Sequence, residues 1–158
     1  MNFKHVIWDW NGTLVDDTWL FVDIMNGVLK NRNLPPITLQ DYRDVFDFPV
    51  KDYYLKLGFN FSDEPFESSG LDFIKIYDRR KFEPKLFEDT LSTLNRLKKL
   101  GYTHSILSAQ NTTTLQQSVK HYNLHNIFDY INGLDDHYAI GKIEQGKLLI
   151  QNLNYNKD

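Results

Sequence analysis

The chain has 158 residues, of which 41% are hydrophobic and 25% charged, and its formal net charge is −3. This length suits one domain-sized unit with a sizeable core, and the acidic balance gives no basic surface for nucleic acid. Because the sequence has no cysteine, no signal-peptide pattern and no apolar run near the roughly 18 residues of a membrane span, we expect a cytoplasmic protein without disulfides, thiol nucleophiles or membrane contact.

The first predicted element is a short apolar strand over residues 3–8, which delivers Asp9 to a turn containing Asn11, Gly12 and Thr13. Ligands of open α/β sheets bind at the carboxyl ends of the strands. Gly12 tolerates a positive φ and lets an anion approach the backbone N–H groups, while Thr13 can donate to the same anion. This arrangement favours an Asp9 that attacks a phosphoryl group or binds a metal while the turn holds the phosphoryl oxygens.

Helical periodicity follows in the segment 16–82, which also holds much of the aromatic content of the chain. Apolar residues three and four apart predict helices over 16–30 and 71–82. A short helix after Thr38 and another over 50–57 are expected between them. Thr38 followed three residues later by an Asp is typical of a helix N-cap.

Strands and helices then alternate to the end of the chain. The predicted elements are a helix over 87–100, a strand over 102–107, a helix over 112–121, a strand over 127–131 and a helix over 141–153. This alternation predicts a parallel, three-layer α/β fold. At the end of the second strand, the hydroxyl of Ser108 and the backbone N–H of Ala109 suit a phosphate oxygen, and Asn111 is expected to cap the next helix.

The N-terminal strand and turn resemble the first motif of the haloacid dehalogenase (HAD) superfamily. Its phosphatases carry Asp-x-Asp-Gly-Thr-(Leu/Val) after the first strand, and Asp9, Gly12, Thr13 and Leu14 match this pattern. The resemblance implies that Asp9 is the nucleophile, which forms an aspartyl-phosphate. It also implies that Asp9 and the backbone carbonyl of Asn11 bind Mg²⁺.

Two later residues resemble further motifs of this superfamily. Ser108, at the end of an apolar strand, resembles the second motif and would bind phosphate together with Ala109. Lys142, just before the last helix, resembles the third motif, a lysine that neutralises the nucleophile and the phosphate. Lys147 is the alternative for this role, and we interpret it as a solvated surface lysine.

The resemblance implies a Rossmann-like parallel sheet core of three layers, formed by residues 1–15 and 83–158. Residues 16–82 would form a helical C1-type cap inserted after the first strand, as in phosphoglycolate-phosphatase-like members. The alternative is a set of helices that merely covers one face of the sheet. Since the motifs recognise only phosphate, the cap must supply substrate contacts, for which Arg43 and Lys51 are the candidates.

The chain departs from the family pattern at two points. Asn11 replaces the second Asp, the general acid and base of the phosphatases, and acid–base catalysis is typically worth roughly 10²–10⁴-fold in rate. Asn keeps the backbone carbonyl of that position but cannot exchange a proton. The fourth motif, Gly-Asp-(x)n-Asp after a further strand, is missing, and we expect that the sequence is truncated before it.

The expected function is therefore Mg²⁺-dependent hydrolysis of a small phosphate monoester through Asp9, slowed by Asn11. The main alternative is a non-catalytic HAD-like protein that binds a phosphorylated ligand or a protein partner. A receiver-like or flavodoxin-like domain is a weaker alternative, because those folds have no long helical insert after the first strand.

Overall fold

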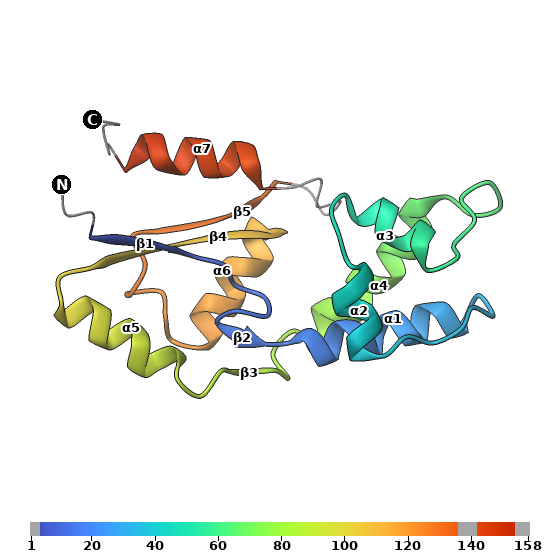
Figure 1. The fold of residues 1–158 in the computed structure, drawn as a ribbon, viewed down its shortest axis with the longest axis horizontal. Coiled ribbons are helices and arrows are strands. Elements are labelled where there is room, and N and C mark those ends of the chain that lie inside the picture. The colour runs from blue at the N-terminus through green and yellow to red at the C-terminus, as the bar shows by residue number, and fades with distance from the viewer. Residues whose placement is uncertain (1–3, 136–141, 154–158) are drawn as a thin grey trace.

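The computed structural model describes residues 4–135 and 142–153 (Figure 1). At one end of the molecule lies a sheet of three parallel strands, in the order β1 (His5–Trp8), β4 (Thr103–Asn111) and β5 (Tyr130–Leu134). The helices that flank the sheet are α5 (Thr90–Lys99), α6 (Thr112–His121) and α7 (Ile143–Asn152). Figure 1 shows α7 on one face and α5 and α6 on the other, which confirms the predicted three-layer α/β fold.

Residues 18–80 form a separate group of helices at the other end of the molecule (Figure 1). These cap helices are α1 (Thr18–Lys30), α2 (Leu39–Val45), α3 (Val50–Lys56) and α4 (Phe66–Arg80). A short antiparallel pair, β2 (Val15–Asp16) and β3 (Lys85–Leu86), lies where the chain enters and leaves them. The sequence did not predict this pair, because strands of two residues show no periodicity.

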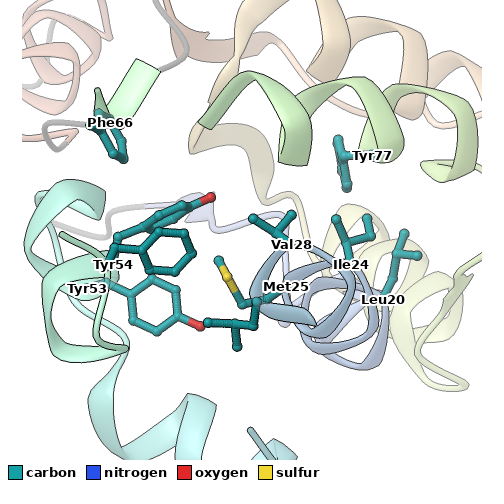
Figure 2. Packing of buried hydrophobic residues seen from close by; sticks show 10 residues of the cluster. Leu20, Ile24, Met25, Val28, Tyr53, Tyr54, Phe66 and Tyr77 are labelled. Carbon is teal, nitrogen blue, oxygen red and sulfur yellow. The ribbon is translucent and has the colours of Figure 1, made fainter. Parts of the chain in front are cut away.

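The cap helices have a hydrophobic core of their own. Figure 2 shows side chains of α1, α3 and α4 pointing toward one another, with Met25 of α1 facing Tyr53 and Tyr54 of α3. Trp19 is 39% exposed, and its indole N–H donates to the backbone carbonyl of Asp16, while Leu20 occupies the core position.

A second hydrophobic cluster packs α5 and α6 against the sheet. Leu94, Ile106 and Leu115, from α5, β4 and α6, are fully buried in it. Trp10, just after β1, is 1% exposed in the same cluster. The turn that follows Asp9 is therefore fixed to the sheet core by the ring of its first residue, Trp10.

Several predicted boundaries shift for identifiable reasons. The third strand spans 130–134 instead of 127–131, because the buried Phe128 packs in the loop that precedes β5. The helix expected over 87–100 begins at Thr90, since the Phe87 N–H and the Thr90 hydroxyl both donate to the carbonyl of Leu14. The helix expected over 71–82 begins earlier, at Phe66.

Other local predictions are confirmed. The Thr38 hydroxyl accepts a hydrogen bond from the backbone N–H of Asp41, and the Asp41 carboxylate accepts one from the backbone N–H of Thr38. The Asn111 side chain accepts from the backbone N–H groups of Thr113 and Thr114 and so caps α6. Within the described residues, no helix is long and apolar enough to cross a membrane.

Candidate active site

Asp9 and Lys142, predicted from opposite ends of the chain, lie in contact. Asp9 follows the last residue of β1, and Lys142 is the N-cap residue of α7. The Lys142 Nζ lies 2.8 Å from Asp9 Oδ1 and also donates to the backbone carbonyl of Leu107 in β4 at 3.3 Å. Because the Trp10 backbone N–H donates to the same carboxylate oxygen at 2.9 Å, the Asp9 side chain is held from two sides.

Ser108 and Asn11 lie beside this pair. Ser108 is 1% exposed in β4, and its hydroxyl is 3.4 Å from the Asn11 side-chain oxygen, a long contact. The Ser108 oxygen also accepts from the backbone N–H of Gln110 at 3.1 Å. The structure therefore brings together Asp9, Asn11, Ser108 and Lys142, as the sequence predicted.

The backbone N–H groups of the turn after Asp9 donate hydrogen bonds to acceptors in neighbouring residues. Gly12, at φ +67, donates to the carbonyl of Val15 and to the carboxylate of Asp17, and Thr13 donates to the carbonyl of Trp10. Gly12 lines the cavity of the site, as does Ala109, whereas Thr13 is not among the lining residues. In this geometry the predicted phosphate contact by Thr13 lacks support, and its role stays a prediction.

Asp17 is a site residue that the sequence analysis missed. Its carboxylate accepts from the side-chain amide of Asn11 at 2.5 Å and from the backbone N–H of Gly12 at 2.9 Å. Asp17 is 1% exposed, and this burial raises its pKa to about 6, although the two hydrogen bonds act in the opposite direction. A carboxylate is thus present beside position 11, but on a different residue. The only sequence signal was an Asp pair, Asp16-Asp17, at the start of a helix.

Gln110 connects the sheet to the cap. Its side-chain amide donates to the phenol oxygen of Tyr77 in α4 at 2.8 Å. Tyr77 is buried in the cap, and burial raises the pKa of its hydroxyl well above the usual value, so that this oxygen stays protonated. The residue two positions after Ser108 therefore fixes α4 above the site.

A cavity of about 690 Å³ opens above these residues. Its polar end, at the sheet, is formed by Asp9, Asn11, Ser108, Ala109 and Lys142. Its cap end lies among aromatic and aliphatic side chains of α1 to α4. One continuous space thus joins the predicted phosphate-binding residues to the interior of the cap.

The two cap residues predicted to contact substrate differ in position. Arg43, in α2, is exposed and lines the cavity. Lys51, in α3, is not among the lining residues, and its ammonium lies 5.7 Å from the ring centroid of Phe61. The geometry therefore supports a substrate contact only for Arg43.

The polar end offers oxygen donors suited to magnesium. A carboxylate at Asp9 and a backbone carbonyl at Asn11 are hard ligands, and Mg²⁺ typically combines one or two carboxylates with waters and substrate phosphate oxygens. Within residues 4–135 and 142–153, no cluster of three or more Asp, Glu or His side chains forms a complete protein cage for a metal. The donor set fits a magnesium ion that keeps waters and shares its ligands with a phosphate.

Comparison with known proteins gives one family and many related structures. Residues 6–154 match a family model described as haloacid dehalogenase-like hydrolase. None of the curated proteins compared with the chain matches it.

Three similar solved structures illustrate the shared fold. The chain aligns with a haloacid dehalogenase-like family hydrolase from Streptococcus pneumoniae at TM-score 0.76 and 21% identity, covering 94% of this chain and 70% of the other. A predicted phosphatase from Clostridium acetobutylicum aligns at TM-score 0.73 and 20% identity, with coverages of 98% and 72%. A predicted phosphoglycolate phosphatase from Haemophilus somnus aligns at TM-score 0.69 and 19% identity, with coverages of 85% and 65%. At these identities the likeness concerns the fold.

Proposed function

This chain belongs to the haloacid dehalogenase-like hydrolase family, and from that premise we propose that it is a phosphatase acting on phosphate monoesters through an aspartyl-phosphate on Asp9. The observation that carries the proposal is the Asp9–Lys142 ion pair at the polar end of the cavity, beside Ser108. Structures described as phosphatases share the fold, which supports the same reaction.

The proposed reaction has two displacements at phosphorus. An oxygen of Asp9 attacks the phosphorus atom while the bond to the substrate's bridging oxygen breaks, and the alcohol leaves with a proton from solvent. Water then attacks the aspartyl-phosphate, which releases inorganic phosphate and restores the Asp9 carboxylate. The Lys142 ammonium, 2.8 Å from Asp9, offsets the negative charge of the phosphoryl oxygens in both steps.

Magnesium completes this charge balance in the proposal. Asp9 and the Asn11 backbone carbonyl would hold the ion, and when bound it supplies electrostatic stabilisation of the phosphoryl oxygens. The Ser108 hydroxyl, buried within β4, would donate to one of those oxygens.

Asn11 is expected to lower the rate of the reaction. Its amide donates to Asp17 and carries no exchangeable proton for the leaving group. Loss of general acid–base assistance typically costs roughly 10²–10⁴-fold in rate. Activated aryl phosphates, which need least protonation, are therefore expected to react faster than alkyl phosphates.

The direct test is phosphate release from a panel of alkyl and aryl phosphates, with and without Mg²⁺. It uses the purified protein in the longest form that its gene encodes, and Asp9→Asn as the control. We expect release that requires both Mg²⁺ and Asp9. Release that survives Asp9→Asn in a preparation free of other phosphatases would contradict the proposal.

A second candidate function is binding of a phosphorylated ligand without turnover. The Asn11–Asp17 hydrogen bond favours it, because the amide occupies the position of the catalytic acid. Such a protein would bind phosphonate analogues of the substrates, which cannot be hydrolysed. It would stay inactive when a carboxylate is placed at position 11.

A further inference from the structure

We propose that the substrate is a phosphate monoester of an apolar, ring-containing alcohol, with the ring among the aromatic side chains of the cap and the phosphoryl group at Asp9. This inference rests on the proposed phosphatase function and adds the chemical class of the leaving alcohol. It narrows the expected small phosphate monoester to one chemical class.

The size of the cavity is the first argument. Its volume of about 690 Å³ lies within the range of roughly 300–1,000 Å³ that is typical of pockets for drug-sized ligands. A phosphoryl group, with its few heavy atoms, fills only the polar end. The cap end is large enough for a ring and its linker.

The chemical character of the cap end is the second argument. The Phe21 ring of α1 stacks on Phe73 and Tyr77 of α4, with centroids 5.7 and 5.4 Å apart and interplanar angles of 15° and 22°. All three residues line the cavity. Aromatic pairs gain energy beyond burial when ring faces and edges meet in such offset arrangements. A ligand ring placed in this space would extend an existing set of near-parallel rings.

Two hydrogen bonds through Gln110 connect the polar end of the cavity to the aromatic stack. Tyr77 belongs to this aromatic stack, and its hydroxyl accepts a hydrogen bond from Gln110. Gln110 in turn donates its backbone N–H to Ser108 at the polar end. The aromatic stack therefore contacts a residue that lies two positions after Ser108. A substrate would need a linker of only a few atoms between its phosphoryl group and its ring.

The charges along the cavity argue against a second anionic group on the substrate. The charged lining residues of α1 to α4 are Arg43, Glu67 and Asp78, and all three are exposed. Two of them are acidic, so the cap presents no net positive charge to a carboxylate. An anionic alcohol would lose its hydration in the cap without a buried cation to compensate.

The first experiment compares two substrates that share the same leaving oxygen. Both 3-phenylpropyl phosphate and propyl phosphate release a primary alcohol, so their intrinsic reactivities match and the ring alone differs. Burial of a phenyl group predicts a kcat/KM about 10- to 100-fold higher for 3-phenylpropyl phosphate. A ratio near or below one would overturn the inference while leaving the phosphatase proposal intact.

Binding of phosphonates separates failure of this inference from failure of the proposed function. The matched probes are 3-phenylpropylphosphonate and propylphosphonate, measured by calorimetry. If neither ester is hydrolysed but the phenyl compound binds about 10- to 100-fold tighter, the phosphatase proposal is wrong and the ring site stands. Equal affinities, or no binding of either probe, would overturn the ring site.

A space-filling variant locates the ring site. Gly70 of α4 lines the cavity, and a Cβ at this position would meet only the Phe66 ring, at 3.8 Å. Gly70→Leu therefore fits the helix and fills part of the cap end. The matched control is Gly27→Leu in α1, at an exposed position where a Cβ has no neighbour within 4 Å.

The variants are compared by the ratio of the two kcat/KM values, or of the two phosphonate affinities. We expect Gly70→Leu to lower the ratio by about tenfold, since one or two misplaced methylene groups have effects of this size in a pocket. Gly27→Leu should keep the wild-type ratio. An unchanged ratio in a folded Gly70→Leu protein would place the ring outside this cavity.

Discussion

The two ends of the cavity are built by different kinds of interaction. At the polar end, Asp9, Lys142, Asn11 and Asp17 are fixed by hydrogen bonds and an ion pair, each to a partner at a defined distance. At the cap end, stacked and edge-on rings line the space with few directional contacts. A hydrogen-bonded arrangement tolerates little change, whereas packed rings can be replaced by other apolar groups of similar volume. The comparison assigns the chemistry to one end and the substrate preference to the other.

The largest expected effect is at Asp9. Asp9→Asn removes the nucleophile, and loss of a nucleophile typically costs about 10⁴-fold or more in kcat. The side chains of the Asp9–Lys142 pair are 45% and 31% exposed, so loss of the pair should cost at most about 1 kcal/mol of stability. Turnover and thermal unfolding of the variant measure the two effects separately. A large fall in melting temperature together with lost turnover would point to a structural role.

Lys142 comes next, with Lys147 of the same helix as its matched control. Lys142→Met removes the cation beside Asp9 and should lower kcat/KM by about 10²–10³-fold, as does loss of one stabilising donor in other enzymes. Lys147 pairs with Glu144 on the surface, and Lys147→Met should have little effect. Equal activity in the two variants would remove Lys142 from the site.

Exchanging Asn11 and Asp17 is expected to have a smaller effect, an increase in kcat. In Asn11→Asp/Asp17→Asn the amide and carboxylate change places, so that the new Asn accepts from the Gly12 N–H and donates to the new Asp. An acid at position 11 should raise kcat on alkyl phosphates by about 10-fold or more. Asn11→Asp alone places two carboxylates together and should gain less. No gain in the double variant, despite tight phosphonate binding, would favour the binding-protein alternative.

The smallest effect is a pH dependence of stability that arises in the sheet and not in the cap. Burial lowers the pKa of His104, which accepts a hydrogen bond from the Trp8 indole in the sheet. A backbone hydrogen bond at Leu94 and the charge of Asp129 act in the opposite direction, and nearby His5 and Lys98 lower the pKa further. Since the unfolded chain then binds the proton more tightly, the contribution of His104 to stability should fall as the pH drops below 6.5, by up to about 1.4 kcal/mol per pH unit. Asp17, whose pKa is raised to about 6, contributes with the opposite sign below that pH, so the His104 contribution is read from the difference between wild type and variant.

Urea unfolding between pH 5 and 7 measures this dependence, with His104→Gln as the control that keeps a hydrogen-bond acceptor. The acid-induced loss should be smaller in the variant. In the cap, burial raises the pKa of the tyrosines, among them Tyr54, so these residues stay neutral over this range. A wild-type slope that persists in His104→Gln would assign the proton uptake elsewhere.

The sequence predicted the polar end well because its residues follow directly from strand ends. Asp9 follows β1 and Ser108 lies in the carboxyl-terminal half of the parallel strand β4, which extends beyond the predicted end at residue 107. Their proximity at one edge of the sheet needs no knowledge of side-chain packing. Lys142 could be placed from its position before the last helix. The roles of these residues stay predictions, whereas the fold and the family are now established.

What the sequence could not predict depends on contacts between distant segments. The Gln110–Tyr77 hydrogen bond joins a strand end to a cap helix, and no local spacing marks it. The Asp17 carboxylate turns back toward Asn11 instead of capping α1, a choice set by burial and not by the helix signal. Lys51 was proposed from its place after a turn, yet α3 directs it toward Phe61. Sequence periodicity gives the helices but not their orientation over the cavity.

The measurement that tests the central claim most directly is detection of the aspartyl-phosphate. The protein is quenched in acid during turnover of an aryl phosphate with Mg²⁺, digested, and analysed by mass spectrometry. We expect a phosphoryl group on the peptide that contains Asp9, which hydroxylamine removes, and none in Asp9→Asn. Steady turnover of wild-type protein with the phosphoryl group on another residue, or with unchanged rate in Asp9→Asn, would contradict the account.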